Sequence, residues 1–376
     1  MHVNELLARA VDQGASDLHL KAGGVPMLRV RGSLVPMADT PRLQAVDLDG
    51  IATAVLTPSH SALIGHHQDV DLAYTVPGLG RFRCNVFQQR GAVGLVFRVI
   101  PQIIPGFDAL GLPAVLSSIA AEERGLVLGT GTTGSGKSTT LAALVDAINQ
   151  ARTAHIVTIE DPIEYLHQDR QSVINQREIG IDTASFATAL RSALRQDPDV
   201  ILVGEMRDHA TIETALMAAE TGHLVLSTLH TLDATETINR IIGVFPAHQQ
   251  PQIRLQLATV LKAIVAQRLI PRADGQSRAA AVEVLIATPF IRDAIADPAR
   301  THLVQSAIAQ GGSQYGMQTF DQAIFGLYES GSVSLDEARR WASNVDEFML
   351  RVQGIGSGAA SAGGAVASPD ITRFSK

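Results

Sequence analysis

Eight consecutive residues, 131–138, have the types and the spacing of a phosphate-binding loop. They are G-T-T-G-S-G-K-S, and they follow an apolar segment at 126–129. In such a loop the glycines let backbone N–H groups turn toward phosphate oxygens, and the start of the next helix adds a favourable dipole. Lys137 is expected to reach the β- and γ-phosphates, and Ser138 to bind Mg²⁺. A glycine-rich turn that fits this pattern by chance is expected in about one chain in a hundred.

Three further apolar segments each end next to titratable side chains. They are 156–159, followed by Glu160, Asp161 and Glu164; 200–203, followed by Glu205; and 224–228, preceded by His223 and followed by His230. Groups that contact ligands in open α/β sheets gather beyond the carboxyl ends of the strands. Mg²⁺ and the attacking water need an acidic neighbour, which favours Glu205, and His230 lies where a contact with the γ-phosphate is expected. Glu160 or Asp161 could instead close a turn before Pro162, and His223 could be a structural histidine.

The loop and the strand ends together predict an ATP site with Mg²⁺ as its metal. Ser138 and Glu205 are the expected metal ligands. The loop residues expected to contact the nucleotide are Gly131, Thr132, Thr133, Gly134, Ser135, Gly136, Lys137, Ser138 and Thr139.

The N-terminal residues predict a small domain of mixed helix and strand. Apolar side chains recur at helical spacing over 3–11, and short strand-like runs follow, broken by glycines and prolines. The segments 80–90 and 91–100 are expected to form a hairpin-like pair of strands. We therefore predict an α+β domain over 1–100 and a linker at 101–112, which begins with two prolines around a short apolar run.

After the linker, apolar runs alternate with helical segments. The runs are rich in Val, Ile and Leu without polar alternation, which is typical of strands buried on both faces of a parallel sheet. The last run of this kind is AVEVLI at 281–286. This alternation indicates an α/β domain, predicted over 113–290.

The C-terminal part is expected to be helical over 291–352. Thr319 with Gln322 resembles a capping box that opens one helix, and a second helix is expected over 336–352. Most of the residues that follow are Gly, Ala or Ser, a composition that cannot build a core. We expect the tail, 353–376, to be disordered.

Composition narrows the class of protein. The 376 residues suggest two or three domains, and 30 Lys plus Arg stand against 37 Asp plus Glu, a formal charge of −7. This acidic balance and the few aromatics argue against a general nucleic-acid binder. Cys84 is the single cysteine, which excludes an internal disulfide and a multi-cysteine zinc site. The sequence contains neither an apolar run of about 18 residues nor the core of a signal peptide, so we expect a soluble intracellular protein.

Three motifs together resemble the secretion ATPase superfamily of type II secretion and type IV pili. LRQDPDVILVGEMRD (194–208) fits the pattern L-R-x-x-P-D-x4-G-E-x-R-D, TIEDPIE (158–164) resembles the family's aspartate box, and HLVLSTLHT (223–231) its histidine box. Within this superfamily the chain is most similar to the PilT-type retraction ATPases of twitching motility. The segments that carry this similarity are GASDLHL (14–20), INQRE (174–178), AETGHL (219–224) and GMQT (316–319). The resemblance extends over about residues 1–350.

The resemblance implies a fold and a set of roles. It implies a PAS-like N-terminal α+β domain, then a RecA-like P-loop NTPase domain with a C-terminal helical extension. Six subunits would form a ring, with ATP between the two domains of a subunit. Glu164 would orient or deprotonate the attacking water, and Arg83 and Arg98 would neutralise developing charge. His223 and Arg81 would also lie near the nucleotide.

The resemblance also implies a function, ATP hydrolysis that powers type IV pilus retraction. The implied partners are further copies of the chain and an inner-membrane pilus platform protein, on its cytoplasmic face. Nucleic acid and direct membrane insertion are not expected. The implied location is cytoplasmic and peripheral to the inner membrane.

Two departures from relatives bear on the alternatives. Assembly-type relatives usually carry a four-cysteine zinc insertion, which a chain with one cysteine lacks. This absence favours the retraction-type subgroup over the assembly-type one. In the segment 290–297, Ala296 and Asp297 stand where retraction-type relatives have Arg and Glu; ATP hydrolysis should not depend on these positions, whereas coupling to retraction could. An accessory or assembly-type ATPase is therefore the main alternative. A RecA-like nucleic-acid translocase and a nucleotide-binding regulator without turnover are less favoured.

Overall fold

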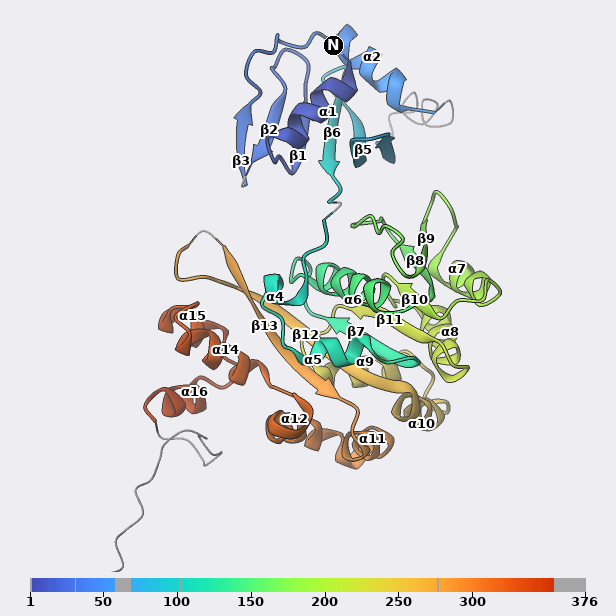
Figure 1. The fold of residues 1–376 in the computed structure, drawn as a ribbon, viewed down its shortest axis with the longest axis vertical. Coiled ribbons are helices and arrows are strands. Elements are labelled where there is room, and N and C mark those ends of the chain that lie inside the picture. The colour runs from blue at the N-terminus through green and yellow to red at the C-terminus, as the bar shows by residue number, and fades with distance from the viewer. Residues whose placement is uncertain (1, 31, 58–68, 102, 276, 355–376) are drawn as a thin grey trace, which may run out of the picture.

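The computed structural model describes residues 2–30, 32–57, 69–101, 103–275 and 277–354. It contains an N-terminal α+β part, a larger α/β part and a set of C-terminal helices (Figure 1). The predicted disorder of the tail concerns residues that, apart from the first two, lie outside the described ranges. Within those ranges, no helix is both long enough and apolar enough to cross a bilayer.

The N-terminal part is built on a six-stranded antiparallel sheet with the strand order β3-β2-β1-β6-β5-β4. Its elements are α1 (Val3–Asp12), β1 (Asp17–Leu20), β2 (Met27–Val30), β3 (Ser33–Pro36), α2 (Ala45–Val55), β4 (Val70–Val76), β5 (Gly80–Gln89) and β6 (Ala92–Val99). The apolar sides of both helices and the apolar residues of the central strands share one core. The helical spacing at the start of the sequence is thereby confirmed as a buried helix face.

The predicted hairpin is confirmed as β5 and β6. Its two turn residues, Arg90 and Gly91, have φ angles of 51° and 76°. Positive φ at both central positions is typical of the two-residue turn whose twist matches that of the strands. The resulting register places Arg83 directly opposite Arg98.

The larger part is built on a seven-stranded sheet with the order β13-β12-β7-β11-β10-β8-β9. Its strands are β7 (Gly125–Thr130), β8 (His155–Glu160), β9 (Val173–Glu178), β10 (Val200–Val203), β11 (Leu224–Leu229), β12 (Leu261–Pro271) and β13 (Arg278–Ile286). Neighbouring strands are parallel, except that β13 runs antiparallel to β12. The prediction that 281–286 belongs to a parallel arrangement was therefore wrong, because the short connection before β13 permits only a hairpin.

Alternate residues of the buried strands enter two different cores, one on each face of this sheet. Leu126 and Leu128 of β7 pack in the core that includes α7 to α10, whereas Val127 packs with α5 and α6. Burial on both faces explains why these strands show no polar alternation. The helices are α4 (Phe107–Leu110), α5 (Val115–Ala120), α6 (Lys137–Ala151), α7 (Phe186–Ala193), α8 (His209–Glu220), α9 (Ala234–Gly243) and α10 (Gln250–Val260).

The C-terminal helices pack on β12 and β13 and on α9 and α10 of the larger part (Figure 1). They are α11 (Pro289–Ala296), η1 (Pro298–Leu303), α12 (Val304–Gln310), α13 (Gly312–Tyr315), α14 (Phe320–Glu329), α15 (Leu335–Trp341) and α16 (Val345–Val352). The predicted capping box is confirmed: Thr319 accepts from the N–H of Gln322, whose side chain accepts from the N–H of Thr319.

The prediction of one helix over 336–352 was wrong, because the segment forms two helices, α15 and α16. The carboxylate of Asp321 accepts the backbone N–H groups of Ser343 and Asn344, at 2.6 and 3.0 Å. Asn344 then caps α16 by accepting from the N–H of Glu347. Polar side chains that bind backbone groups in this way compete with the helix and favour its ends.

Candidate nucleotide-binding and hydrolysis site

The predicted phosphate-binding loop connects the end of β7 to the start of α6. The ammonium group of Lys137 is buried and donates to the carbonyl oxygens of Gly131 and Thr132, at 2.8 and 2.9 Å. Burial lowers the pKa of Lys137, while the negative charges of Glu205 and Glu164 oppose that shift. The charges of two predicted site residues, Glu164 and Glu205, thus act on the ammonium of a third, Lys137.

The backbone of the loop requires glycine at two positions. Gly131 has φ of 140°, and a Cβ there would lie 2.4 Å from the carbonyl oxygen of Gln267. Gly136 has φ of 92°, and its Cβ would lie 2.7 Å from Gln267 Nε2. Side chains are strained at such angles and would collide with β12. The glycines thus allow β12 to support the loop from behind.

An unpaired hydroxyl group and an open position in the loop suit the binding of a phosphate chain. Ser135 Oγ is buried and, among the described residues, has no hydrogen-bond partner. Since an unpaired buried hydroxyl is costly, it indicates a partner that completes the site. Gly134 leaves open space where a side chain would stand, and the helix that follows presents its N-terminus, which favours anions.

Glu205 follows β10 and lies beside His230, which follows β11. His230 Nε2 is 3.2 Å from Glu205 Oε1, and Arg207 Nε contacts the same oxygen. Burial disfavours the charged carboxylate, but the Arg207 hydrogen bond and the charge of His230 outweigh it and lower the pKa of Glu205. An ionised carboxylate is a ligand that Mg²⁺ prefers, and the joint binding of a metal ion by Glu205 and Ser138 stays a prediction. The predicted pair of Glu205 and His230 is therefore in contact.

The aspartate-box loop, residues 161–172, follows Glu160, the last residue of β8. The Glu160 carboxylate accepts from Thr158 Oγ1 at 2.6 Å and from Gln176 Nε2 at 3.0 Å. Burial raises the pKa of Glu160, and these hydrogen bonds oppose the rise. Glu160 is thus a half-buried part of the loop's support, whereas Glu164 is exposed.

Two side chains of α6 hold the aspartate-box loop, and neither contact was predicted from the sequence. Thr139 Oγ1 lies 2.8 Å from the hydroxyl of Tyr165, next to Glu164. The fully buried Asn149 binds the loop's backbone at Gln168, Arg170 and Ser172. A buried polar residue on the apolar side of α6 is the signal that could have identified Asn149. The hydroxyl of Thr139 faces the loop, and its predicted nucleotide contact stays a prediction.

The predicted arginines lie in the N-terminal sheet with different partners. Arg98 Nε is 2.9 Å from Asp17, and Arg83 Nε is 3.5 Å from Asp71, so both pair within that sheet. Arg81 instead crosses to the larger part and bonds Glu178 at 2.8 Å. The approach of these arginines to phosphates stays a prediction.

His223 does not lie with the other predicted site residues. It precedes β11, whose first residue pairs with Gly125 at the start of β7, whereas the phosphate-binding loop follows the end of β7. A strand of this length separates the two ends by roughly 20 Å. The ring of His223 contacts the carbonyl of Ala218 at 2.9 Å. Within its own chain His223 therefore lies apart from the phosphate-binding loop, and its predicted nucleotide contact stays a prediction.

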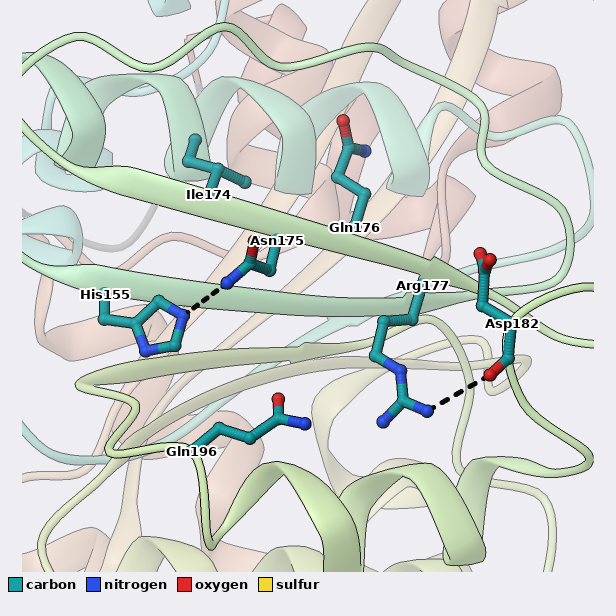
Figure 2. Close-up of a pocket in the computed structure, with 7 residues that line it drawn as sticks. All are labelled: His155, Ile174, Asn175, Gln176, Arg177, Asp182 and Gln196. Carbon is teal, nitrogen blue, oxygen red and sulfur yellow. Dashed lines mark hydrogen bonds between the residues drawn. The ribbon is translucent and has the colours of Figure 1, made fainter.

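A cavity of about 620 Å³ lies beside β9 (Figure 2). It is lined by His155, Ile174, Asn175, Gln176, Arg177, Asp182 and Gln196. Arg177 donates to the carbonyl oxygen of Asp182 at 3.2 Å, and Asn175 lies 2.8 Å from the ring of His155. None of the lining residues belongs to the phosphate-binding loop, so this cavity is separate from the candidate site.

His167, in the aspartate-box loop, makes the stability of the protein depend on pH. Burial lowers its pKa to about 4, and its Nδ1 is buried without a partner among the described residues. The unfolded chain takes up a proton near pH 6.5, so stability is lost as pH falls from 6.5 toward 4. Between pH 7 and pH 5 the loss is about 2 kcal/mol. Denaturant unfolding should show this loss in the parent and a smaller one in His167→Gln; equal pH dependence would contradict the assignment.

Known proteins are similar in sequence to this chain over most of its length. The model of the family described as Type II/IV secretion system protein matches residues 94–335. The chain is 45% identical over 348 residues to the type IV pilus retraction ATPase PilT of Pseudomonas aeruginosa, covering 93% of this chain and 100% of that protein. It is 40% identical over 353 residues to the type IV pilus ATPase PilU of the same organism, covering 94% and 92%.

A solved structure has the same fold. The crystal structure of the pilus retraction motor PilT with bound ADP matches with a TM-score of 0.84 and 45% identity, covering 92% of this chain and 98% of that chain. The identity is high enough to carry the ATPase assignment together with the fold, and the phosphate-binding loop described above supports it. The chain therefore belongs to the Type II/IV secretion system protein family, as an ATPase of its pilus-retraction group.

Proposed function

We propose that this chain is an ATP-hydrolysing motor that powers retraction of type IV pili. The observation that carries the proposal is that Glu205 contacts His230 and that the charges of Glu205 and Glu164 act on the buried Lys137 of the phosphate-binding loop. The similarity to the retraction ATPase PilT over nearly the whole chain supports the same assignment.

Phosphoryl transfer needs positioning and charge neutralisation more than covalent chemistry. Lys137 and the N–H groups of its loop would hold the phosphates. Mg²⁺, held by Ser138 and through water by Glu205, would supply charge neutralisation. Glu164, exposed at the edge of the aspartate-box loop, would orient or deprotonate the attacking water. His230 would sense the γ-phosphate through its contact with Glu205.

We further propose that the N-terminal part is PAS-like, that the larger part is RecA-like, and that ATP binds between them. Arg83 and Arg98 would then leave their partners in the N-terminal sheet when the two parts close on the nucleotide. Arginines that act in this way raise the rate by about 10³ to 10⁵ in related mechanisms. Closure would therefore control hydrolysis, and rotation between the two parts would perform the mechanical work.

The proposed assembly is a ring of six copies. Its proposed partner is the inner-membrane platform protein of the pilus, on the cytoplasmic face, which places the motor in the cytoplasm at that membrane. Both proposals rest on the family to which the chain belongs.

Complementation tests the proposed function. A strain that lacks its retraction ATPase should regain twitching and lose excess surface pili when it carries this chain, but not when it carries Lys137→Ala. Full restoration by Lys137→Ala would contradict the proposal, because retraction would then not require ATP hydrolysis by this chain.

An accessory retraction ATPase is the second candidate function. The 40% identity to PilU favours it, as do Ala296 and Asp297 at the end of α11. A strain that lacks only its accessory ATPase distinguishes the two candidates. Restoration in that strain, without restoration in the strain that lacks the main motor, would favour the accessory role.

A further inference from the structure

We propose that Glu178 is a positioning residue for hydrolysis, joining Arg81 of the N-terminal part to the backbone beside Glu164. The inference rests on the proposed function, in which Glu164 acts on the attacking water. Glu178 itself has no part in the proposed chemistry. It acts through the loop that carries Glu164.

One carboxylate oxygen of Glu178 makes both contacts. Glu178 Oε2 accepts from Arg81 Nη2 at 2.8 Å and from the backbone N–H of Ile163 at 3.2 Å. Glu178 is 7% exposed, and the side chain of Arg81 is 20% exposed. An ion pair shielded in this way is much less screened than a surface pair, and removing one partner leaves a charge uncompensated.

Two contacts bracket Glu164. On one side Glu178 of β9, the partner of Arg81, accepts from the backbone N–H of Ile163. On the other side the N–H of Leu166 donates to the carbonyl oxygen of Pro101 at 3.4 Å. Pro101 lies two residues after the end of β6. The stretch that contains Glu164 is therefore linked to the N-terminal part on one side through the ion pair of Glu178 with Arg81, and on the other through the segment that leaves the N-terminal sheet.

The junction leaves little freedom for movement. The cavity between Arg81, Arg83, Pro162 and Glu178 has a volume of about 10 Å³, room for one water molecule at most. Glu178 is also fixed from behind, because its N–H donates to Asp182 Oδ2 at 2.8 Å and its strand pairs with β8. A movement of the N-terminal part that displaces Arg81 must break the ion pair or shift the backbone next to Glu164.

A double-mutant cycle of Arg81→Gln and Glu178→Gln in the full chain tests the link. We expect each single variant to lower kcat about 10- to 100-fold, since a misplacement of about 1 Å at a reacting group costs about 100-fold. KM for ATP and the affinity for a non-hydrolysable ATP analogue should not change. Because both residues act through one contact, the double variant should be no slower than the slower single variant.

Two results would overturn the proposal. Effects that multiply in the double variant would mean that Arg81 and Glu178 act independently, for example with Arg81 on phosphate alone. Parental or faster turnover in Glu178→Gln would mean that the carboxylate pairs with Arg81 but does not position Glu164. If Glu178→Gln folds poorly by circular dichroism, Glu178→Asp takes its place in the cycle, with the same criteria.

The matched control is an ion pair of the aspartate-box loop, which also carries Glu164. Arg170 of this loop pairs with Asp146 of α6 at 3.3 Å, a contact within the larger part. Arg170→Gln should keep the parental kcat and KM. If Arg170→Gln loses as much kcat as Glu178→Gln, any ion pair that holds the loop has the same effect. That result would overturn the specific role of Glu178. The parent protein separates the two levels of inference. Without turnover in the parent the proposed function fails, whereas turnover in the parent with a multiplicative cycle defeats this inference alone.

Discussion

Replacing Lys137 by Ala is expected to abolish ATP hydrolysis, with turnover falling at least about 100-fold. The reason is electrostatic. Lys137 is a buried cation at the phosphate-binding loop, and it donates to the carbonyls of Gly131 and Thr132. Its ammonium would turn from these carbonyls to the phosphates, and no other side chain of the loop carries a positive charge. A steady-state phosphate-release assay at saturating ATP measures the effect.

Lys262→Ala is the matched control for this variant. Lys262 pairs with Glu122 at 2.7 Å and packs against Gly125, at the start of β7 rather than at the end that carries the loop. Its removal also deletes a half-buried ammonium, so a general loss of charge or of packing would appear in both variants. We expect parental turnover in Lys262→Ala. Normal hydrolysis in Lys137→Ala would contradict the assignment of the site.

Glu164→Gln is expected to separate binding from hydrolysis. The amide has the shape of the carboxylate but cannot accept a proton, so turnover should fall by about 10² to 10⁴ while ATP binding persists. Since Glu164 is exposed and lies in a loop held by Tyr165 and Asn149, the substitution should not disturb the fold. Single-turnover kinetics and binding of a fluorescent ATP analogue measure the two effects.

Two further variants, one a control and one a test of the alternative base, are needed to interpret the result for Glu164. Glu220→Gln changes an exposed carboxylate on α8 that bonds only Gln256 among the contacts of the described residues, and it should hydrolyse ATP at the parental rate. Glu205→Gln should also lower turnover, but with a changed dependence on Mg²⁺ concentration, because Glu205 is the proposed metal ligand. If Glu164→Gln retains the parental rate, the base is another group, and Glu205 becomes the first candidate.

The candidate site and its surroundings suggest how hydrolysis and movement are coupled. The aspartate-box loop contacts α6 through Tyr165 and Asn149. It is linked to the N-terminal part through the ion pair of Glu178 with Arg81 and through Pro101. If Glu178 positions Glu164 as proposed, a change in the position of the N-terminal part would reach Glu164 through these contacts, without a change in the phosphate-binding loop.

Much of the site was predictable because its chemistry follows local rules. A glycine-rich loop after a buried strand binds phosphate through its own backbone, and charged residues placed directly after parallel strands meet at one edge of the sheet. These rules located Lys137, Glu164, Glu205 and His230. They did not reveal that His223 lies at the opposite end of its strand from the loop. A histidine next to a strand can stand at either end, and only the strand direction decides which end is near the loop.

The elements that were predicted wrongly show the same limit. An apolar run such as 281–286 indicates burial, but strand direction depends on the partner strand, here β12. The helical spacing over 336–352 shows no sign of the break between α15 and α16. The break could not be predicted from this segment, because the carboxylate that interrupts the helix belongs to Asp321, more than twenty positions earlier.

The sequence by itself determined the class of chemistry, the positions of the phosphate-binding loop and the acidic strand ends, and the alternation of strands and helices. Each of these follows from neighbouring residues. Only the tertiary structure decided which side chains meet. Arg81 and Glu178 are 97 positions apart, and the residues around either one do not predict that the two side chains pair. Pairing across such a distance is set by how sheets and helices pack, so the support of Glu164 became visible only in the folded chain.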